Sequence, residues 1–218
     1  MTASGRRCLG LLLAGVLAAA GCGIPLDESP RAISASGSKP APEQQTASPG
    51  NSPVYLYFIK NDHLAGATRD VPDRGPSSVL AALLAGPTAA ETSNGLISQI
   101  PAGTSVSSVA SDGQTLHIAI SKELADVVGA SRQEAIAQTV FTVTELDGVS
   151  TVEFTVDGKP FKVSSPTRGD VEQVSDCDFV VLMPTDDQIR DAKLGADVTK
   201  HLAARRRVLA GRCPDAGN

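Results

Sequence analysis

The 218-residue chain contains no tryptophan and few other aromatic residues, with two tyrosines and five phenylalanines. Proteins that hold single-stranded nucleic acids stack the bases on aromatic side chains, and sugar-binding clefts use aromatic faces in the same way. Positive charge is also scarce, with 19 basic residues against 24 acidic ones. Nucleic-acid binding depends on clustered Lys and Arg that neutralise phosphates. The composition therefore argues against a nucleic-acid partner and disfavours a sugar-stacking cleft.

Residues with catalytic or metal-binding chemistry are few and scattered. The three histidines, His63, His117 and His201, lack the spacing of metal ligands. A zinc site or a nucleophilic triad needs several such groups to converge. Asp186 and Asp187 are adjacent, but carboxylates in the first turn of a helix are stabilised by the helix dipole. We therefore predict no catalytic, metal-binding or cofactor-binding residues and no enzymatic activity.

The N-terminus contains the pattern of an export signal. Arg6 and Arg7 precede an apolar stretch over 9–20, which suits the central region of a signal peptide and is shorter than the ~20 apolar residues that span a bilayer. The sequence Ala-Ala-Gly-Cys at 19–22 resembles the bacterial lipobox. The resemblance implies that the signal, residues 1–21, is cut before Cys22, whose thiol then carries a diacylglyceryl group. The alternative is a secreted protein with an incidental cysteine.

Lipid on Cys22 would make the cytoplasmic membrane the first partner of the protein, on its extracytoplasmic face. One acyl chain binds a membrane weakly, whereas a diacylglyceryl group supplies the two chains that stable anchoring requires. Loss of Arg6 and Arg7 with the signal would leave 17 basic and 24 acidic residues, a net charge of −7. The mature protein is therefore expected to be acidic and lipid-anchored.

Two further cysteines form the remaining pair. Cys8 belongs to the signal and Cys22 would carry lipid, so Cys177 and Cys213 are left. An even pair in an exported protein favours a disulfide. We therefore predict a bond between these two residues, with two free thiols as the alternative.

The chain divides into four parts by composition. After the signal, residues 22–52 are rich in Ser, Pro and Ala, a composition that cannot bury enough apolar surface to fold. This predicts a disordered linker that holds a domain away from the membrane. Residues 53–165 are expected to form that domain, and residues 166–218 a C-terminal extension.

The first half of the predicted domain alternates strands and helices. The continuous apolarity of 54–59 predicts a central strand, and 64–71 would return beside it across a turn at 61–62. Pro76 suits the first turn of a helix that ends at Gly86. A capping box after this helix, Thr-Ala-Ala-Glu, predicts a second, short helix.

The second half is predicted to contain two hairpins separated by a helix. Asp-Gly steps join 106–110 to 115–120 and 152–156 to 161–163, and such steps favour tight hairpin turns. Between them, Ser131 is read as the first residue of a capping box that opens the best-defined helix of the chain. The domain is thus expected to be α+β, with two main helices packed on a β-sheet.

The extension is predicted to contain a short strand and helices. The apolar run 179–183 favours a strand, and Thr185 opens another capping box. A longer helix follows and ends near Cys213. A disulfide from Cys177 would then hold the extension against itself.

One basic cluster stands out in this helix, at Arg205, Arg206 and Arg207. Such a cluster can contact anionic headgroups or wall polymers by electrostatic attraction. Cations near the C-terminus of a helix are also favourable for the helix alone. Both interpretations stay open at the level of the sequence.

Three stretches of the predicted domain resemble the GerMN domain, named from sporulation and spore germination proteins. They are Leu-Leu-Ala-Gly-Pro-Thr-Ala-Ala-Glu at 83–91, Ile-Pro-Ala-Gly-Thr at 100–104 and Val-Asp-Gly-Lys-Pro at 156–160. The resemblance implies a non-catalytic α+β module that serves protein assembly at the cell envelope, with no catalytic residues or cofactor. It therefore predicts a lipoprotein that binds or scaffolds envelope proteins, whose identity the sequence does not give.

Two other functions compete with this one. An envelope enzyme acting on cell-wall material would require His117, Asp62 or Glu153 to converge with another polar group in a pocket. A module that binds a small envelope ligand would show an apolar pocket of roughly several hundred Å3 with few polar groups.

Overall fold

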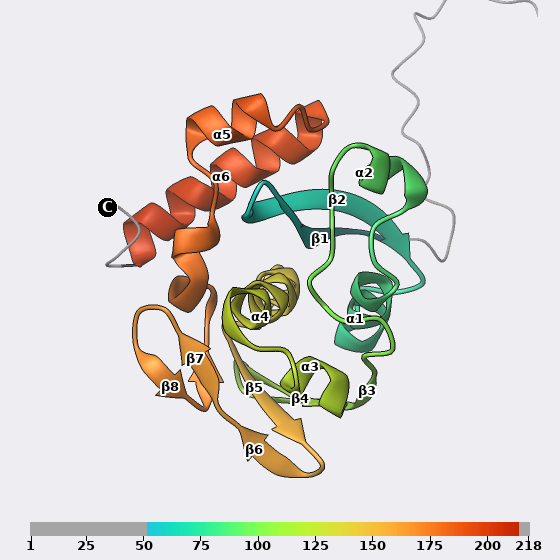
Figure 1. Ribbon diagram of the computed structural model, residues 1–218, viewed down its shortest axis with the longest axis vertical. Helices are drawn as coiled ribbons and strands as arrows, with labels where there is room; N and C mark the ends of the chain where they lie inside the picture. Colours follow the sequence, from blue (N-terminus) through green and yellow to red (C-terminus); the bar gives the residue numbers. More distant parts are fainter. Residues whose placement is uncertain (1–51, 214–218) are drawn as a thin grey trace, which may run out of the picture. The chain divides into compact units, whose positions relative to one another are not determined.

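The computed structural model describes residues 52–213. The predicted signal, Cys22 and the predicted linker as far as residue 51 lie outside the described residues. Figure 1 shows four layers in the described part, with helix α6 (Ala196–Arg212) over a two-stranded ladder, helix α4 (Gly129–Val143) beneath that ladder, and a larger sheet beneath α4. The α+β class predicted from the sequence is confirmed.

The two-stranded ladder joins β1 (Ser52–Lys60) to β2 (His63–Val71) in antiparallel register. The predicted turn is correct, because Asn61 and Asp62 both have positive φ, at 51° and 62°, as a two-residue hairpin turn requires. The prediction of a central strand is wrong, because β1 has β2 as its one strand neighbour among residues 52–213. Its continuous apolarity has another cause, since α1 (Pro76–Leu84) and α4 pack on β1 while α6 packs on β2.

The outer edge of β1 is satisfied by side chains rather than by another strand. The Tyr57 N–H donates to Thr142 Oγ1 at 3.0 Å, and Gln138 Nε2 donates to the Tyr57 carbonyl at 3.3 Å. Farther along, the backbones of Ile59 and Ile97 exchange two hydrogen bonds of 2.9 Å. These contacts explain why α4, buried over Glu134–Val143, carries polar residues inside the core.

The helices of the first half begin and end as predicted. Helix α1 has Pro76 in its first turn, and the left-handed Gly86, at φ 75°, follows its end. In α2 (Ala89–Ser93), Thr88 Oγ1 accepts from the Glu91 N–H and the Glu91 carboxylate accepts from the Thr88 N–H, which is the predicted capping box.

The larger sheet has the order β3-β4-β5-β6. Both predicted hairpins are present, and the two central strands run parallel with α4 as the connection between them. Leu116, Ile118 and Ile120 are buried on the face toward the helices. The bounds are β3 (Val106–Asp112), β4 (Thr115–Ile120), β5 (Thr151–Val156) and β6 (Lys159–Phe161), with β9 (Gln173–Val174) paired to the start of β5.

The predicted start of the longest domain helix is wrong by three residues. After the short α3 (Lys122–Ala125), α4 begins at Gly129, and its N-cap residue Val128 makes no side-chain cap. Ser131 lies inside the first turn, and Glu134 is 8% exposed because it enters the core rather than reaching back to the helix terminus. Arg132 holds this end instead by donating to the backbone carbonyls of Ala125 and Val127.

The predicted strand over 179–183 is also wrong, because residues 179–182 belong to a 3-10 segment, η1 (Asp176–Leu182), which is kinked at Phe179 and ends before the extended Met183. Phe179, Val180 and Met183 are buried. A five-residue apolar run does not distinguish a strand from a buried helical segment. The small hairpin of β7 (Val163–Ser165) and β8 (Gly169–Val171) precedes this helix.

The rest of the extension is helical and lies on the domain. Helix α5 (Asp186–Asp191) opens with the predicted capping box of Thr185 and Gln188. Helix α6 buries Leu202 and Leu209 in the same hydrophobic core as the domain residues. Cys177 and Cys213 form a disulfide, with 5.3 Å between their Cα atoms. The extension is therefore bonded to itself and also packed against the β1–β2 ladder (Figure 1).

Candidate functional site

A polar cluster lies where α6 packs on the ladder. The ring of His201 stacks on that of Tyr55, with centroids 3.8 Å apart. Glu145, just beyond α4, accepts a 2.8 Å hydrogen bond from the Tyr57 hydroxyl, and His201 Nε2 lies 3.1 Å from the same carboxylate oxygen. Arg205 Nε is 3.5 Å from this oxygen. One carboxylate thus joins β1, the end of α4 and α6.

The electrostatics of this cluster keep Glu145 ionised. Burial opposes its charge, but the hydrogen bond from His201 and the charge of Arg205 outweigh burial and hold the pKa of Glu145 below its ordinary value. Burial, and then the charge of Glu145, raises the pKa of Tyr55 and of Tyr57. Both phenols therefore stay neutral. A carboxylate held ionised by several donors stabilises the packing of α6 and is poorly suited to exchange protons with a substrate.

A second buried carboxylate adjoins the disulfide. Asp176 is 1% exposed, and its Oδ2 accepts from Arg205 at 2.6 Å and also from Arg212. Because Cys177 follows Asp176 directly, the disulfide and the ion pairs hold the same end of α6. Cys177 and Cys213 also lie close enough to Asp176 to suggest metal ligands, but their sulfur atoms are bonded to each other.

The three arginines predicted to contact anions have different positions. Arg205 is held between Glu145 and Asp176, with a side chain 15% exposed. Arg206 donates to the Pro184 carbonyl at 3.1 Å. Arg207 is exposed and donates to a carbonyl of its own helix. The structure gives Arg205 an internal role, and contact with an anionic surface stays a prediction for the exposed Arg207.

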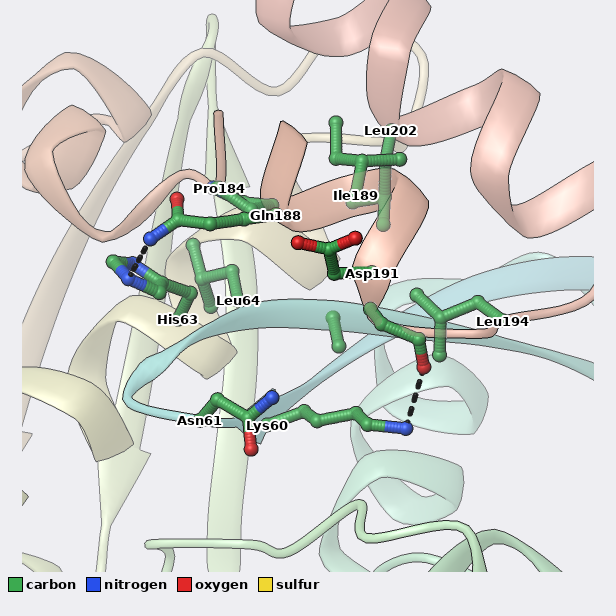
Figure 2. Close-up of a pocket in the computed structure, with 12 residues that line it drawn as sticks. Lys60, Asn61, His63, Leu64, Pro184, Gln188, Ile189, Asp191, Leu194 and Leu202 are labelled. Atoms are coloured by element: carbon green, nitrogen blue, oxygen red, sulfur yellow. Dashed lines mark hydrogen bonds between the residues drawn. The ribbon is translucent and has the colours of Figure 1, made fainter. Parts of the chain in front are cut away.

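A small pocket opens beside the tip of the β1–β2 hairpin, between the hairpin and α5 (Figure 2). Its volume is about 210 Å3. Lys60 Nζ donates to the Ala192 carbonyl at 2.6 Å and to the Asn94 carbonyl at 2.6 Å, and His63 Nε2 lies 2.6 Å from Gln188 Nε2. Aliphatic side chains form the remaining wall, chiefly Leu64, Ile189, Leu194 and Leu202.

Lys60, His63 and Gln188 already make hydrogen bonds at this pocket. Asn61 and Asp191 line it as well. The volume is also below the ~300–1,000 Å3 of typical ligand sites. The volume of this pocket is therefore smaller than the small-ligand alternative requires.

The enzyme alternative requires His117, Asp62 or Glu153 to converge with another polar group in a pocket. In the described region they do not do so. His117 and Glu153 pair across β4 and β5 at 3.2 Å, on the outer face of the sheet, with side chains 40% and 36% exposed. Gln173 joins them there, with its Nε2 at 3.3 Å from the Glu153 carboxylate. Asp62 is exposed in the hairpin turn. Burial of Glu134 raises the pKa of that carboxyl, and the negative charge of Asp62 raises it further.

Sequence reasoning missed the polar cluster because its members are far apart in the chain. Tyr57 and Glu145 are separated by 88 positions, and Glu145 and His201 by 56. The one available signal was the pair of tyrosines in a chain otherwise poor in aromatic residues.

The described fold is an α+β domain, and the comparisons with known proteins assign it to a family. Residues 55–162 match the Germane family, described as sporulation and spore germination. The chain is therefore a GerMN-domain protein, as the resemblance of its three motifs predicted. No curated protein matches it.

The similar solved structures include the following three. The first GerMN domain of the sporulation protein GerM from Bacillus subtilis is 22% identical, with a TM-score of 0.46, covering 57% of this chain and 97% of that one. The tandem GerMN domains of the same protein are 17% identical, with a TM-score of 0.41, covering 50% of this chain and 40% of the tandem protein. A candidate lipoprotein from Clostridium perfringens is 20% identical, with a TM-score of 0.39, covering 58% and 88%.

Among the helices over residues 52–213, none has the length and apolarity needed to cross a membrane.

Proposed function

We propose that this protein is a lipoprotein of the cell envelope, anchored through Cys22 to the extracytoplasmic face of the membrane, whose GerMN domain binds or scaffolds other proteins. The observation that carries the proposal is the family match over 55–162. The lipobox-like Ala-Ala-Gly-Cys at 19–22 supplies the anchor. No catalytic role is proposed.

The described fold supports a binding role through its rigidity. Arg205 joins α6 to the domain through Glu145 and Thr144, and the disulfide and the ion pairs of Asp176 hold the extension together. Preorganised surfaces bind partners at a lower entropic cost. Sheet edges and grooves between helices are common sites at which proteins bind polypeptide partners.

The linker over 22–52 would set the reach of the domain. A flexible segment of about 30 residues has a root-mean-square span of roughly 30 Å. The domain would therefore search a shallow layer above the membrane, and its partners are expected to be membrane proteins or proteins held at the membrane.

Anchoring is tested by replacing the lipid-bearing cysteine. We expect Cys22→Ala to leave the fold unchanged, as judged by circular dichroism, and to move the chain from the membrane to the soluble fraction of the producing cells. Cys8→Ala is the matched control, because Cys8 lies in the predicted signal and its loss should leave the protein in the membrane. A Cys22→Ala chain that stays in the membrane would refute the anchor.

A further inference from the structure

The strand β3 is an edge of the larger sheet, at the opposite end from the three-residue β6. Among residues 52–213 it pairs with β4 and with no other strand. The edge of β1 differs, because Thr142 and Gln138 bond to the backbone of Tyr57. No such side-chain contact to the outward backbone of β3 is found among residues 52–213.

The ladder between β3 and β4 identifies which backbone groups of β3 are available. The Ser121 N–H donates to the Ser105 carbonyl at 2.9 Å, so alternate residues of β4, counted back from Ser121, direct their backbone toward β3. His117 is one of these, and it is paired with Ala110. Ala110 therefore bonds to β4, while its neighbours Val109 and Ser111 each direct an N–H and a C=O away from the sheet.

This edge has little of the usual protection against pairing. Natural edge strands are protected by lysine, proline, inward-pointing charges or β-bulges. Residues 106–111 are Val-Ser-Ser-Val-Ala-Ser, without charge or proline, and the first acidic residue is Asp112. A register shift between Val106 and Ser108 is the one irregularity of the strand, and it leaves the regular part from Ser108 onward free to pair.

An uncharged groove runs beside the same edge. It lies between α1 and β3 and has a volume of about 310 Å3. All of its lining residues are uncharged: Ser77, Leu80, Ala81, Leu84 and residues 104–109. A charged partner segment would find no complementary group here, whereas an uncharged strand with a helix beside it fits both the edge and the groove.

We propose that the occupant is a second copy of this chain, paired antiparallel along β3 about a twofold axis at Ala110. The inference rests on the proposed function, since anchoring at a shared membrane raises the effective concentration of the copies. In this register, Val109 faces Ser111 of the second copy and Ser111 faces its Val109, which forms four main-chain hydrogen bonds. The two larger sheets become one continuous sheet.

The register is self-complementary in charge as well as in hydrogen bonding. Asp112 faces Ser108 of the second copy rather than another Asp112, so no like charges are opposed. A twofold interface uses the same patch on both copies, and the α1 helices of the two copies lie on the same side of the joined sheet, where each borders the uncharged groove.

The register gives two cysteine variants with opposite expectations. Across the axis, the two Ala110 residues form a non-hydrogen-bonded pair with Cα atoms about 4.5 Å apart, within the ~4.4–6.8 Å of disulfides. The two Asp112 residues would be offset by four strand positions, about 13 Å. Ala110 and Asp112 are both exposed and on the same face of β3, so their access to oxidant is matched.

The experiment is disulfide trapping of the full-length protein in membranes of the producing cells. Membranes carrying wild-type, Ala110→Cys or Asp112→Cys protein are oxidised with copper phenanthroline and analysed by non-reducing electrophoresis. We expect Ala110→Cys to give a dimer band at least tenfold stronger than wild type, and Asp112→Cys to match wild type. Equal bands for the two variants would show random collision, and a missing band for Ala110→Cys would show no pairing; either result overturns the proposal.

A proline variant tests whether the pairing uses the main chain. Ser111→Pro removes an outward N–H without removing a bond to β4, so adding it to Ala110→Cys should abolish the band. A persistent band would overturn the proposed register. The dimer and the anchor can fail separately. If Ala110→Cys gives no dimer band, but the wild-type chain is in the membrane and the Cys22→Ala chain is released, the dimer is refuted and the proposed anchor stands.

Discussion

The carboxylate of Glu145 is predicted to be a major support of the packing between α6 and the domain. Its side chain is 18% exposed, and it receives the Tyr57 hydroxyl at 2.8 Å and His201 at 3.1 Å. Hydrogen bonds to a charged group contribute about 1.5–3 kcal/mol each when buried, and leaving their partners unpaired adds a cost. We expect Glu145→Ala to lower the free energy of unfolding by about 2–4 kcal/mol.

The assay is guanidinium unfolding of the unlipidated Cys22→Ala chain with its disulfide intact. The matched control is Glu172→Ala, which removes an exposed carboxylate 4.0 Å from Lys162 and should cost less than about 1 kcal/mol. A double-mutant cycle with Tyr57→Phe should give a coupling of about 1 kcal/mol or more. If Glu145→Ala and Glu172→Ala were equal in effect, the reasoning about the cluster would be refuted.

The difference in unfolding free energy between wild type and Glu145→Ala should depend on pH in a predictable direction. The pKa of Glu145 is lowered in the folded chain, so its contribution is complete above the ordinary carboxyl pKa of about 4.3 and is lost as the pH falls through the folded value. The stability difference between wild type and Glu145→Ala should therefore shrink in acid. A difference that grew as the pH fell would contradict the assigned direction.

Two further predictions concern the extension and the ladder. Cys177→Ser with Cys213→Ser opens a loop of sequence separation 36, and the chain-entropy relation gives a loss of about 3–4 kcal/mol, measured by denaturant unfolding; an unchanged midpoint would show that the bond adds nothing to stability. Gly66→Ala places a Cβ against the ring of Tyr55 and should break its stacking on His201, which tyrosine fluorescence and the unfolding midpoint would report. Gly211→Ala, with open space around the added carbon, is its control, and equal midpoints for the two variants would contradict the close approach.

Local signals predicted much of the fold because they act within a few residues. The turns at Asn61 and at the Asp-Gly steps, and the capping boxes of Thr88 and Thr185, are each decided by the nearest backbone groups. Ser131 failed as a cap because the helix starts earlier, where Arg132 bonds to the preceding loop.

Burial by distant segments explains the other errors. The apolarity of 54–59 indicated a central strand, but the coverage comes from helices, including an α6 that lies about 140 residues away in sequence. The secondary structure of 179–183 could not be predicted from its apolar residues, because burial against the rest of the fold decides it. Glu145 and Asp176 both pair with Arg205 in the folded chain. This pairing joins residues that are far apart in the sequence, so no local pattern predicts it.

The most direct test of the central claim is crosslinking of the native lipoprotein in living cells, followed by its purification from membranes and identification of the bound proteins. The proposed function predicts at least one envelope protein that is recovered with the wild-type chain and is lost with Cys22→Ala, although both chains are folded and equally abundant. Recovery of no other protein with the wild-type chain, or the same proteins with both chains, would contradict a lipid-anchored GerMN domain that acts by binding partners at the membrane.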